Sequence, residues 1–275
     1  LNTKNLTGEF AWSSNFNISF NKNKVLEVGV DGRPIYGSAA NANNAFITKP
    51  GYPIASFYGY KYIGVFQSEE ELAKYPHLSG DKVGDGRYED VNKDGVLDQN
   101  DKTILGDNNP LFTAGFSNSF SYKNFTLDIQ FTGSYGAEVF SFYKRMCGIY
   151  HGDRNGMIEQ LGRWQSKDQP GDGIHFRPTR TPSGWQRDPS SAWVQDASYL
   201  RLRNLTLGYN FDQKVLDKMK MKGLRLYVTG QNLFTITNYV GYDPETSSES
   251  GLAQGGDYLG YPAARSFIIG ANITF

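Results

Sequence analysis

The sequence predicts an all-β protein, an antiparallel transmembrane β-barrel of which this chain forms an incomplete portion. Aromatic residues make up 15% of the 275 residues, against a hydrophobic content of only 39%, which is typical of strands with one apolar face. Apolar and polar residues alternate over segments close to the roughly 9–11 residues that a tilted strand needs to cross a bilayer. No stretch approaches the roughly 18 apolar residues of a spanning helix.

Four segments carry the clearest two-residue alternation. In each, apolar side chains alternate with Ser, Thr, Asn or Gln, as expected when one face meets lipid and the other a hydrated lumen. Aromatic residues such as Phe10, Tyr122 and Phe275 bracket these runs, as in the aromatic girdles of a membrane barrel. The four segments are residues 10–20, 112–122, 125–135 and 266–275.

Three weaker segments bring the predicted number of strands to about seven: residues 54–66, 198–211 and 224–236. Single-chain bacterial barrels have an even number of strands and no free edge. The first and last of these strands therefore need partners from outside the chain. Because the chain starts at Leu1 without an initiator Met or signal sequence, we expect residues 1–275 to be part of a longer barrel protein.

The connections between these strands differ in length. Residues 123–124 and 212–222 are short, whereas three connections are long and rich in Gly, Pro and Asp: 67–109, 147–197 and 237–263. Outer-membrane barrels have short periplasmic turns and long extracellular loops, so we expect these three to be extracellular. The alternation of strand direction then predicts that residues 21–53 form a long periplasmic connection.

A soluble β-sandwich also shows alternation, and it remains the alternative fold. The length of the runs favours the barrel. Lys+Arg and Asp+Glu are both 28, so no basic excess favours nucleic acid as a partner. One cysteine, Cys147, and three scattered histidines exclude a disulfide scaffold and indicate no thiolate or histidine metal site.

A calcium-type loop at residues 90–101 is the strongest local motif. Oxygen ligands stand at positions 1, 3, 5, 9 and 12, with Gly95 at position 6 and a backbone carbonyl at position 7. Asp at position 12, where an EF-hand has Glu, shortens the last ligand, and the alternative is a solvated acidic turn. We expect a structural calcium ion held by Asp90, Asn92, Asp94, Val96, Asp98 and Asp101.

Residues 147–197 combine three tryptophans with several arginines, a composition found at binding hot spots. A loop of this length also needs aromatic residues for its own small core, and the sequence leaves both roles open for Trp164, Trp185 and Trp193. No phosphate loop, G-x-S-x-G or H-E-x-x-H motif occurs. We therefore expect no enzymatic activity.

Several segments in combination resemble the C-terminal part of SusC/RagA-type TonB-dependent transporters of Bacteroidetes. The resemblance spans nearly the whole chain. It rests on Gly51-Tyr52-Pro53, Asp90-Val91-Asn92-Lys93-Asp94-Gly95, Ser121-Tyr122-Lys123-Asn124-Phe125, Tyr199-Leu200-Arg201-Leu202-Arg203-Asn204, Gln231-Asn232-Leu233-Phe234 and Gly241-Tyr242-Asp243-Pro244-Glu245.

The resemblance implies a bacterial outer-membrane barrel of about 22 strands, closed by a plug domain, energised by the TonB complex and working with a SusD-like lipoprotein. It implies import of glycans or oligopeptides. The TonB contact would need an N-terminal part that is absent here. Two alternatives stay open: a non-transporting outer-membrane scaffold that presents its loops to partners, and a soluble calcium-dependent sugar-binding module.

Overall fold

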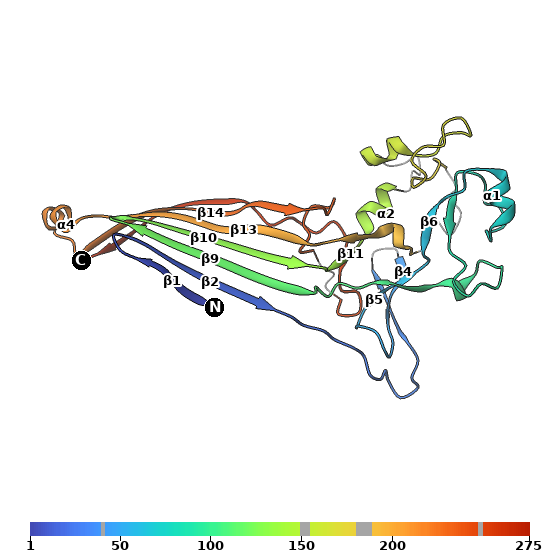
Figure 1. The fold of residues 1–275 in the computed structure, drawn as a ribbon, viewed down its shortest axis with the longest axis horizontal. Helices are drawn as coiled ribbons and strands as arrows, with labels where there is room; N and C mark the ends of the chain where they lie inside the picture. Colours follow the sequence, from blue (N-terminus) through green and yellow to red (C-terminus); the bar gives the residue numbers. More distant parts are fainter. Residues whose placement is uncertain (40–41, 149–154, 180–188, 247–249) are drawn as a thin grey trace.

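Seven strands form one continuous antiparallel sheet, and irregular segments and small sheets gather at one end of it (Figure 1). The computed structural model describes residues 1–39, 42–148, 155–179, 189–246 and 250–275. Each strand of the sheet pairs with the next one along the sheet in chain order. The order is β1 (Asn2–Thr7), β2 (Phe10–Ser19), β9 (Phe112–Tyr122), β10 (Phe125–Tyr135), β13 (Tyr199–Asn210), β14 (Gly223–Thr237) and β16 (Ser266–Thr274).

The register of the strands sorts the side chains into an apolar and a polar face. Phe16, Phe116 and Phe131 stand opposite one another on β2, β9 and β10. Because side chains alternate along a strand, the neighbouring positions Asn17 and Gly115 belong to the other face. Aromatic residues gather at both ends of the apolar face: Phe10, Tyr122, Phe125 and Tyr209 are aligned at one end, and Phe112 and Tyr135 at the other.

A pair of polar residues on β2 and β9 interrupts the apolar face, and hydrogen bonds satisfy both. Ser14 on β2 stands opposite Asn118 on β9. The Asn118 Oδ1 accepts hydrogen bonds from Ser14 Oγ (2.7 Å) and from Trp12 Nε1 (2.9 Å), and Asn118 is only 8% exposed. Pairing polar groups in this way lowers the cost of placing them in an apolar environment.

The two ends of the sheet carry very different connections (Figure 1). At one end, β1 and β2 join through Gly8 and Glu9, β9 and β10 through Lys123 and Asn124, and β13 and β14 through the short helix α4 (Gln213–Met219). At the other end lie the described parts of residues 20–111, 136–198 and 238–265, which we call the head.

The head contains three small sheets and two short helices. Its four-stranded sheet has the order β3 (Ile35–Ala39), β4 (Ala42–Thr48), β5 (Ser56–Gly59) and β8 (Thr103–Gly106). A second sheet pairs β6 (Tyr62–Val65) with β7 (Gly86–Tyr88), and a third has the order β12 (Val194–Asp196), β11 (Glu138–Ser141) and β15 (Gly256–Asp257). The helices are α1 (Glu69–Lys74) and α2 (Phe142–Gly148), with single 3₁₀ turns at Gln99–Asp101, Ile158–Gly162 and Ser191–Trp193.

The head has a hydrophobic core that is rich in phenylalanine. Phe46, Phe57, Phe140 and Phe142 are all fully buried, and their rings lie 5.1–6.5 Å apart in the pairs that touch. The first two come from residues 20–111 and the other two from residues 136–198. Ala253, from the third connection, belongs to the same cluster, so the core joins all three connections.

The structure confirms an antiparallel sheet with strands in six of the predicted segments and corrects the assignment of the seventh. Residues 54–66 form no strand of the large sheet, because their aromatic side chains belong to the head, in β5 and β6. The seventh strand is β1, whose polar sequence carries no alternating signal. Among the described residues, none of the helices has the length and hydrophobicity that a membrane-spanning helix needs.

The prediction that residues 21–53 lie at the end opposite the other long connections is wrong. β2 starts at the end with short connections and runs toward the head (Figure 1), because it is antiparallel to both β1 and β9. Residues 21–53 therefore lie at the same end as the other long connections rather than at the opposite end. The sequence prediction places a strand at residues 54–66 between β2 and β9. Without that strand, β2 runs in the opposite direction from the one predicted, which accounts for the error.

Candidate functional site

The polar face of the sheet is lined by hydroxyl, amide and charged side chains. Near the end with short connections, a groove of about 570 Å³ includes Asp128, Thr126 and Arg225. Ser119 Oγ donates a hydrogen bond to Asp128 Oδ1 (2.6 Å), and Arg225 Nη2 donates to Thr126 Oγ1 (3.3 Å). A surface of this kind holds water and suits the passage of hydrophilic solutes.

A glycine makes room for Arg225 on this face. A Cβ atom at Gly208 would lie 2.6 Å from Thr126 Oγ1 and 2.8 Å from Arg225 Nε. Both distances are shorter than real Cβ contacts, so a side chain at this position would have to displace Arg225. The glycine thereby keeps the guanidinium close to Asp128, at 3.9 Å.

At the head end of the same face, five residues form a charged cluster that we call the arginine clamp: Tyr199, Arg201, Arg203, Asp243 and Glu245. The first three lie on β13, and the two acids belong to the connection between β14 and β16. Arg201 Nη2 donates to Asp243 Oδ1 (2.6 Å), Arg201 Nη1 donates to Glu245, and Arg203 Nη2 donates to Glu245 Oε1 (2.7 Å). The clamp thus ties this connection to the wall of the sheet.

Burial strengthens the arginine clamp. Arg201 is only 2% exposed, and its Nε also donates to Thr235 Oγ1 (2.8 Å) on the neighbouring strand. Burial by itself would raise the pKa of Asp243, but hydrogen bonds from the Ala263 and Glu245 amides and from Arg201 hold it below its usual value. Losing one partner would leave the buried charge only partly compensated, which is destabilising.

A second set of polar contacts links distant parts of the same connection to one another. The Tyr239 hydroxyl donates to the Asp257 carboxylate, and Thr246 Oγ1 donates to Asp257 Oδ1 (3.2 Å). Burial and the neighbouring carboxylate raise the pKa of Tyr239, so the phenol stays protonated and keeps donating. The arginine clamp thus ties the connection to β13, and these contacts fold the connection onto itself.

The sequence motifs showed the members of the arginine clamp but not their pairing. Tyr199-Leu200-Arg201-Leu202-Arg203 and Gly241-Tyr242-Asp243-Pro244-Glu245 are separate segments of the sequence. One signal could have linked the two segments. Arg201 and Arg203 are two residues apart, the spacing of side chains on one strand face, and Asp243 and Glu245 in the turn have the same spacing.

The predicted calcium loop is folded around its own backbone amides. Asp90 accepts hydrogen bonds from the amides of Lys93 (2.7 Å) and Gly95 (2.9 Å), and Asp94 Oδ1 accepts one from Val96 (2.9 Å). Asn92 Oδ1 accepts one from Asp94 (3.0 Å). Gly95 has φ +83°, a conformation that favours glycine.

Asp101, at the last ligand position, ties the two ends of this loop together. It is fully buried, and its carboxylate accepts hydrogen bonds from the amides of Val91 (2.9 Å) and Asp98 (2.8 Å). Asp98 Oδ1 in turn accepts one from the Asn100 amide (2.7 Å).

These contacts leave the calcium assignment a prediction. A carboxylate has about four acceptor positions, so Asp90 and Asp94 could accept a cation beside their amide hydrogen bonds. In the described part of the chain, however, no three His, Cys, Asp or Glu side chains are arranged to hold a metal ion. A well-formed acidic turn would show the same hydrogen bonds.

The tryptophans of the 147–197 segment that the structure describes pack inside the head. Trp193 is 2% exposed and packs against Phe176 in a tilted arrangement, with ring centroids 6.0 Å apart, and Trp164 packs against the same core cluster. Arg177 pairs with the buried Asp85 through two hydrogen bonds of 2.7 and 3.2 Å. Trp185 lies outside the described residues.

Comparison with known proteins gives matches over essentially the whole chain. It is 34% identical to TonB-dependent receptor P3 and 33% identical to TonB-dependent receptor P26, both of Formosa agariphila, in each case over all of this chain and 28% of the relative. It is 27% identical to the TonB-dependent receptor SusC of Bacteroides thetaiotaomicron, over 98% of this chain and 25% of the relative. No protein-family model matches.

Solved structures agree with the fold. The structure of the RagAB peptide transporter matches all of this chain and 28% of the solved one, with a TM-score of 0.78 and 19% sequence identity. The chain thus spans a little more than a quarter of the length of the proteins it matches. The antiparallel sheet and the whole-chain similarity together make these 275 residues a portion of an outer-membrane TonB-dependent receptor of the SusC type.

Proposed function

We propose that the chain forms part of the wall and the extracellular mouth of a TonB-driven outer-membrane importer of glycans or oligopeptides. The observation that carries this proposal is the sheet itself: a continuous set of strands with one apolar and one polar face and with every long connection at one end. Such a sheet fits a barrel wall between lipid and a hydrated lumen. The similarity to SusC-type receptors supports the assignment to transport.

The remainder of the barrel would come from the rest of a longer protein. β1 and β16 stand at the two ends of the strand order, and an open sheet edge in a bilayer leaves backbone groups without hydrogen bonds. Further strands of the same protein would therefore pair with both edges. A plug domain would fill the lumen along the polar face, and the N-terminal part would contact TonB.

The head would form part of the mouth and contact a SusD-like lipoprotein. If the long connections are extracellular, the exposed aromatic residues of the third connection lie on the outer surface. Tyr242 is 65% exposed and Tyr261 is fully exposed. Aromatic side chains of this kind are enriched both at protein interfaces and at ligand sites.

We further propose that calcium binds the loop at residues 90–101 as a structural ion. The support is the ligand spacing together with an extracellular location, where modules that bind calcium at about 10⁻⁴–10⁻³ M would be filled. This assignment concerns the stability of the head and is independent of transport.

An uptake experiment tests the importer against the non-transporting scaffold. The gene for the full-length protein would be deleted in its own bacterium, and uptake of fluorescent oligosaccharides and of fluorescent oligopeptides would be measured with and without TonB. Loss of uptake of one class, restored by the wild-type gene only when TonB is present, supports the importer. Unchanged uptake of both classes would favour the scaffold.

Electrophoresis of the native outer-membrane protein tests the barrel. A folded barrel migrates differently before and after boiling, and a protein several times longer than this chain would be expected from the coverage of the relatives. A species of 30.8 kDa that is soluble without detergent would instead favour the sugar-binding module.

A further inference from the structure

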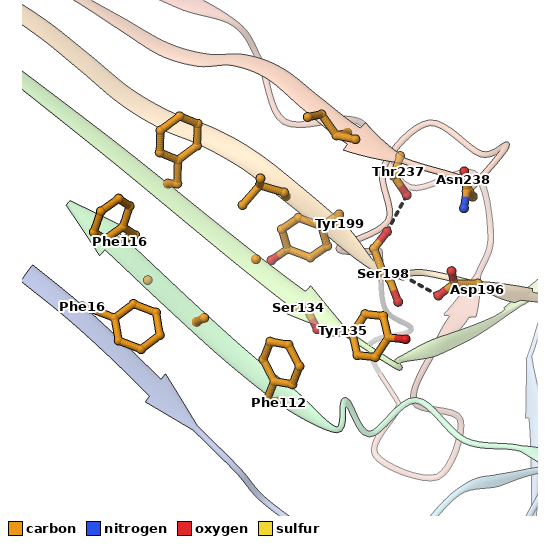
Figure 2. Close-up of a pocket in the computed structure, with 16 residues that line it drawn as sticks. Phe16, Phe112, Phe116, Ser134, Tyr135, Asp196, Ser198, Tyr199, Thr237 and Asn238 are labelled. Carbon is orange, nitrogen blue, oxygen red and sulfur yellow. Dashed lines mark hydrogen bonds between the residues drawn. The ribbon is translucent and has the colours of Figure 1, made fainter. Parts of the chain in front are cut away.

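A pocket of about 700 Å³ lies on the apolar face of the sheet, near the head (Figure 2). Of the arginine clamp, Tyr199 alone lines it, and the other four members do not. Its lining is mainly apolar and comes from five neighbouring strands, β2, β9, β10, β13 and β14, and from Asp196, Ser198 and Asn238 at the head end. No step of the proposed transport uses this side of the sheet.

The strand register explains why the pocket exists. Ala114 on β9 stands opposite Gly133 on β10, so two adjacent positions of the apolar face carry almost no side chain. The next apolar pairs on either side are large: Phe116 opposite Phe131, and Phe112 opposite Tyr135. The small pair therefore forms the floor of the pocket, and the aromatic pairs form two of its walls.

The walls are fixed by contacts between rings. Phe112 and Tyr135 stack with centroids 5.5 Å apart, and Phe16 meets Phe116 at 6.5 Å in an edge-on arrangement. Figure 2 shows these four rings around the pocket. Leu200 and Ile236, from β13 and β14, complete the lining on the far side.

Gly133 keeps the floor open for a steric reason. A Cβ atom at this position would lie 2.9 Å from the backbone oxygen of Tyr199, closer than real Cβ atoms approach. A larger residue would both fill the floor and push on β13. Ala114 has no such restriction, so its replacement fills the pocket more cleanly.

Polar groups line the pocket only at its head end. Asp196 Oδ1 accepts a hydrogen bond from the Ser198 amide (2.8 Å), and Thr237 Oγ1 donates to the Ser198 carbonyl (2.8 Å). Asn238 lies beside them (Figure 2). The site is therefore apolar along its length and polar at the end where a membrane meets water.

We infer that this pocket binds one acyl chain of a bilayer lipid in the leaflet next to the head. The inference rests on the proposed membrane location, because the apolar face would then be covered by lipid. The apolar floor and walls suit a hydrocarbon chain, and the polar end suits the headgroup region. Hydrophilic substrates and a plug would occupy the opposite, polar face, so they are excluded as occupants.

Photo-crosslinking of the full-length protein in vesicles tests this inference. The probe is a phosphatidylethanolamine that carries a diazirine on one acyl chain, and the labelled peptides are mapped by mass spectrometry. We expect labelling to concentrate on residues 112–116 and 131–135. Ala114→Leu, which fills the floor, should reduce this labelling several-fold.

Ala271→Leu is the matched control, since Ala271 lies on β16, opposite Leu226 on the same apolar face and outside the pocket. It should leave the labelling of both segments unchanged. Heat-modifiable migration would establish that both variants are folded. Equal labelling of all apolar strands, or no effect of Ala114→Leu, would overturn the lipid pocket alone, whereas absence of labelling on every strand would overturn the membrane location as well.

Discussion

The seven-stranded sheet and the head expose their apolar side chains in opposite ways. On β16, Phe267 is 72% exposed and Ile269 is 84% exposed, whereas Phe46 and Phe140 in the head are fully buried. The sheet therefore needs an apolar environment around it, while the head carries its own core and can face water. Two different solvents act on the same chain.

The comparison predicts that the two regions respond to different substitutions. The largest effect is expected in the head, where Phe140→Ala would leave a cavity among Phe46, Phe57 and Phe142. Loss of a buried phenylalanine costs about 3–5 kcal/mol. Hydrogen exchange of the full-length protein should become faster in the head and stay slow in the sheet.

Phe267→Ala is the matched control for this experiment, because Phe267 is exposed on the apolar face. It should leave exchange in the head unchanged. Faster exchange of both regions in Phe140→Ala would mean that sheet and head unfold as one unit, and the contrast drawn above would fail.

The second effect should distinguish the two faces of the sheet. Ile269 stands opposite Val228 on the apolar face, and Asn272 stands opposite Arg225 on the polar face. Ile269→Arg places a charge toward lipid and should cost about 2–4 kcal/mol near the bilayer midplane, whereas Asn272→Arg should cost little. Equal losses of folding free energy in a vesicle-folding assay would show that the assignment of the faces is wrong.

A smaller effect is expected at the arginine clamp, which joins the two regions. Asp243→Asn removes one charged partner of the buried Arg201 and should cost about 1.5–3 kcal/mol. Limited proteolysis should then cleave residues 238–265 faster, while the strands stay protected. Asp31→Asn, at an exposed position in the head, should leave the cleavage rate unchanged.

The same contact predicts a dependence on pH. The pKa of Asp243 lies below its usual value, so its stabilising contribution is complete above the unfolded value of about 3.9. It is lost as the pH falls through the lower, folded pKa. Proteolysis of the wild-type connection at acid pH should approach that of Asp243→Asn, and a difference that persisted at all pH values would contradict this assignment.

The smallest effect concerns the calcium loop and would be local to the head. In millimolar calcium, Asp94→Ala should weaken the protection of residues 67–109 from protease while the sheet remains intact. Asp168→Ala, in another turn of the head, provides the control. If wild-type protein is digested identically with and without a chelator, the calcium assignment falls and the loop is an acidic turn.

Much of the sheet could be predicted because apolar and polar residues alternate along most of its strands. Phe112 to Tyr122 and Phe125 to Tyr135 alternate so regularly that their register follows from the tight turn at Lys123 and Asn124. β1 shows no such alternation, because its sequence Asn-Thr-Lys-Asn-Leu-Thr has one apolar residue. This strand is defined only by its pairing with β2.

The head could not be predicted in the same way, because its contacts join residues far apart in the sequence. Tyr58 and Tyr60 looked like part of a membrane strand, yet Tyr60 packs against Tyr88 in a small core of the head. The arginine clamp likewise depends on a fold that brings Arg201 to Asp243. Local spacing identified the loop at residues 90–101, but the burial of Asp101 follows from its contacts with the amides of Val91 and Asp98.

The composition of the head core sets an order for biogenesis. Its members come from all three long connections, with Phe57, Phe140 and Ala253 as one example from each. If the head is extracellular, as we propose, each connection must be translocated before it can contribute. The core can therefore close only after the last connection, just before β16, has reached the outside, so an unfinished chain would expose Phe46 and Phe57 to periplasmic chaperones and proteases.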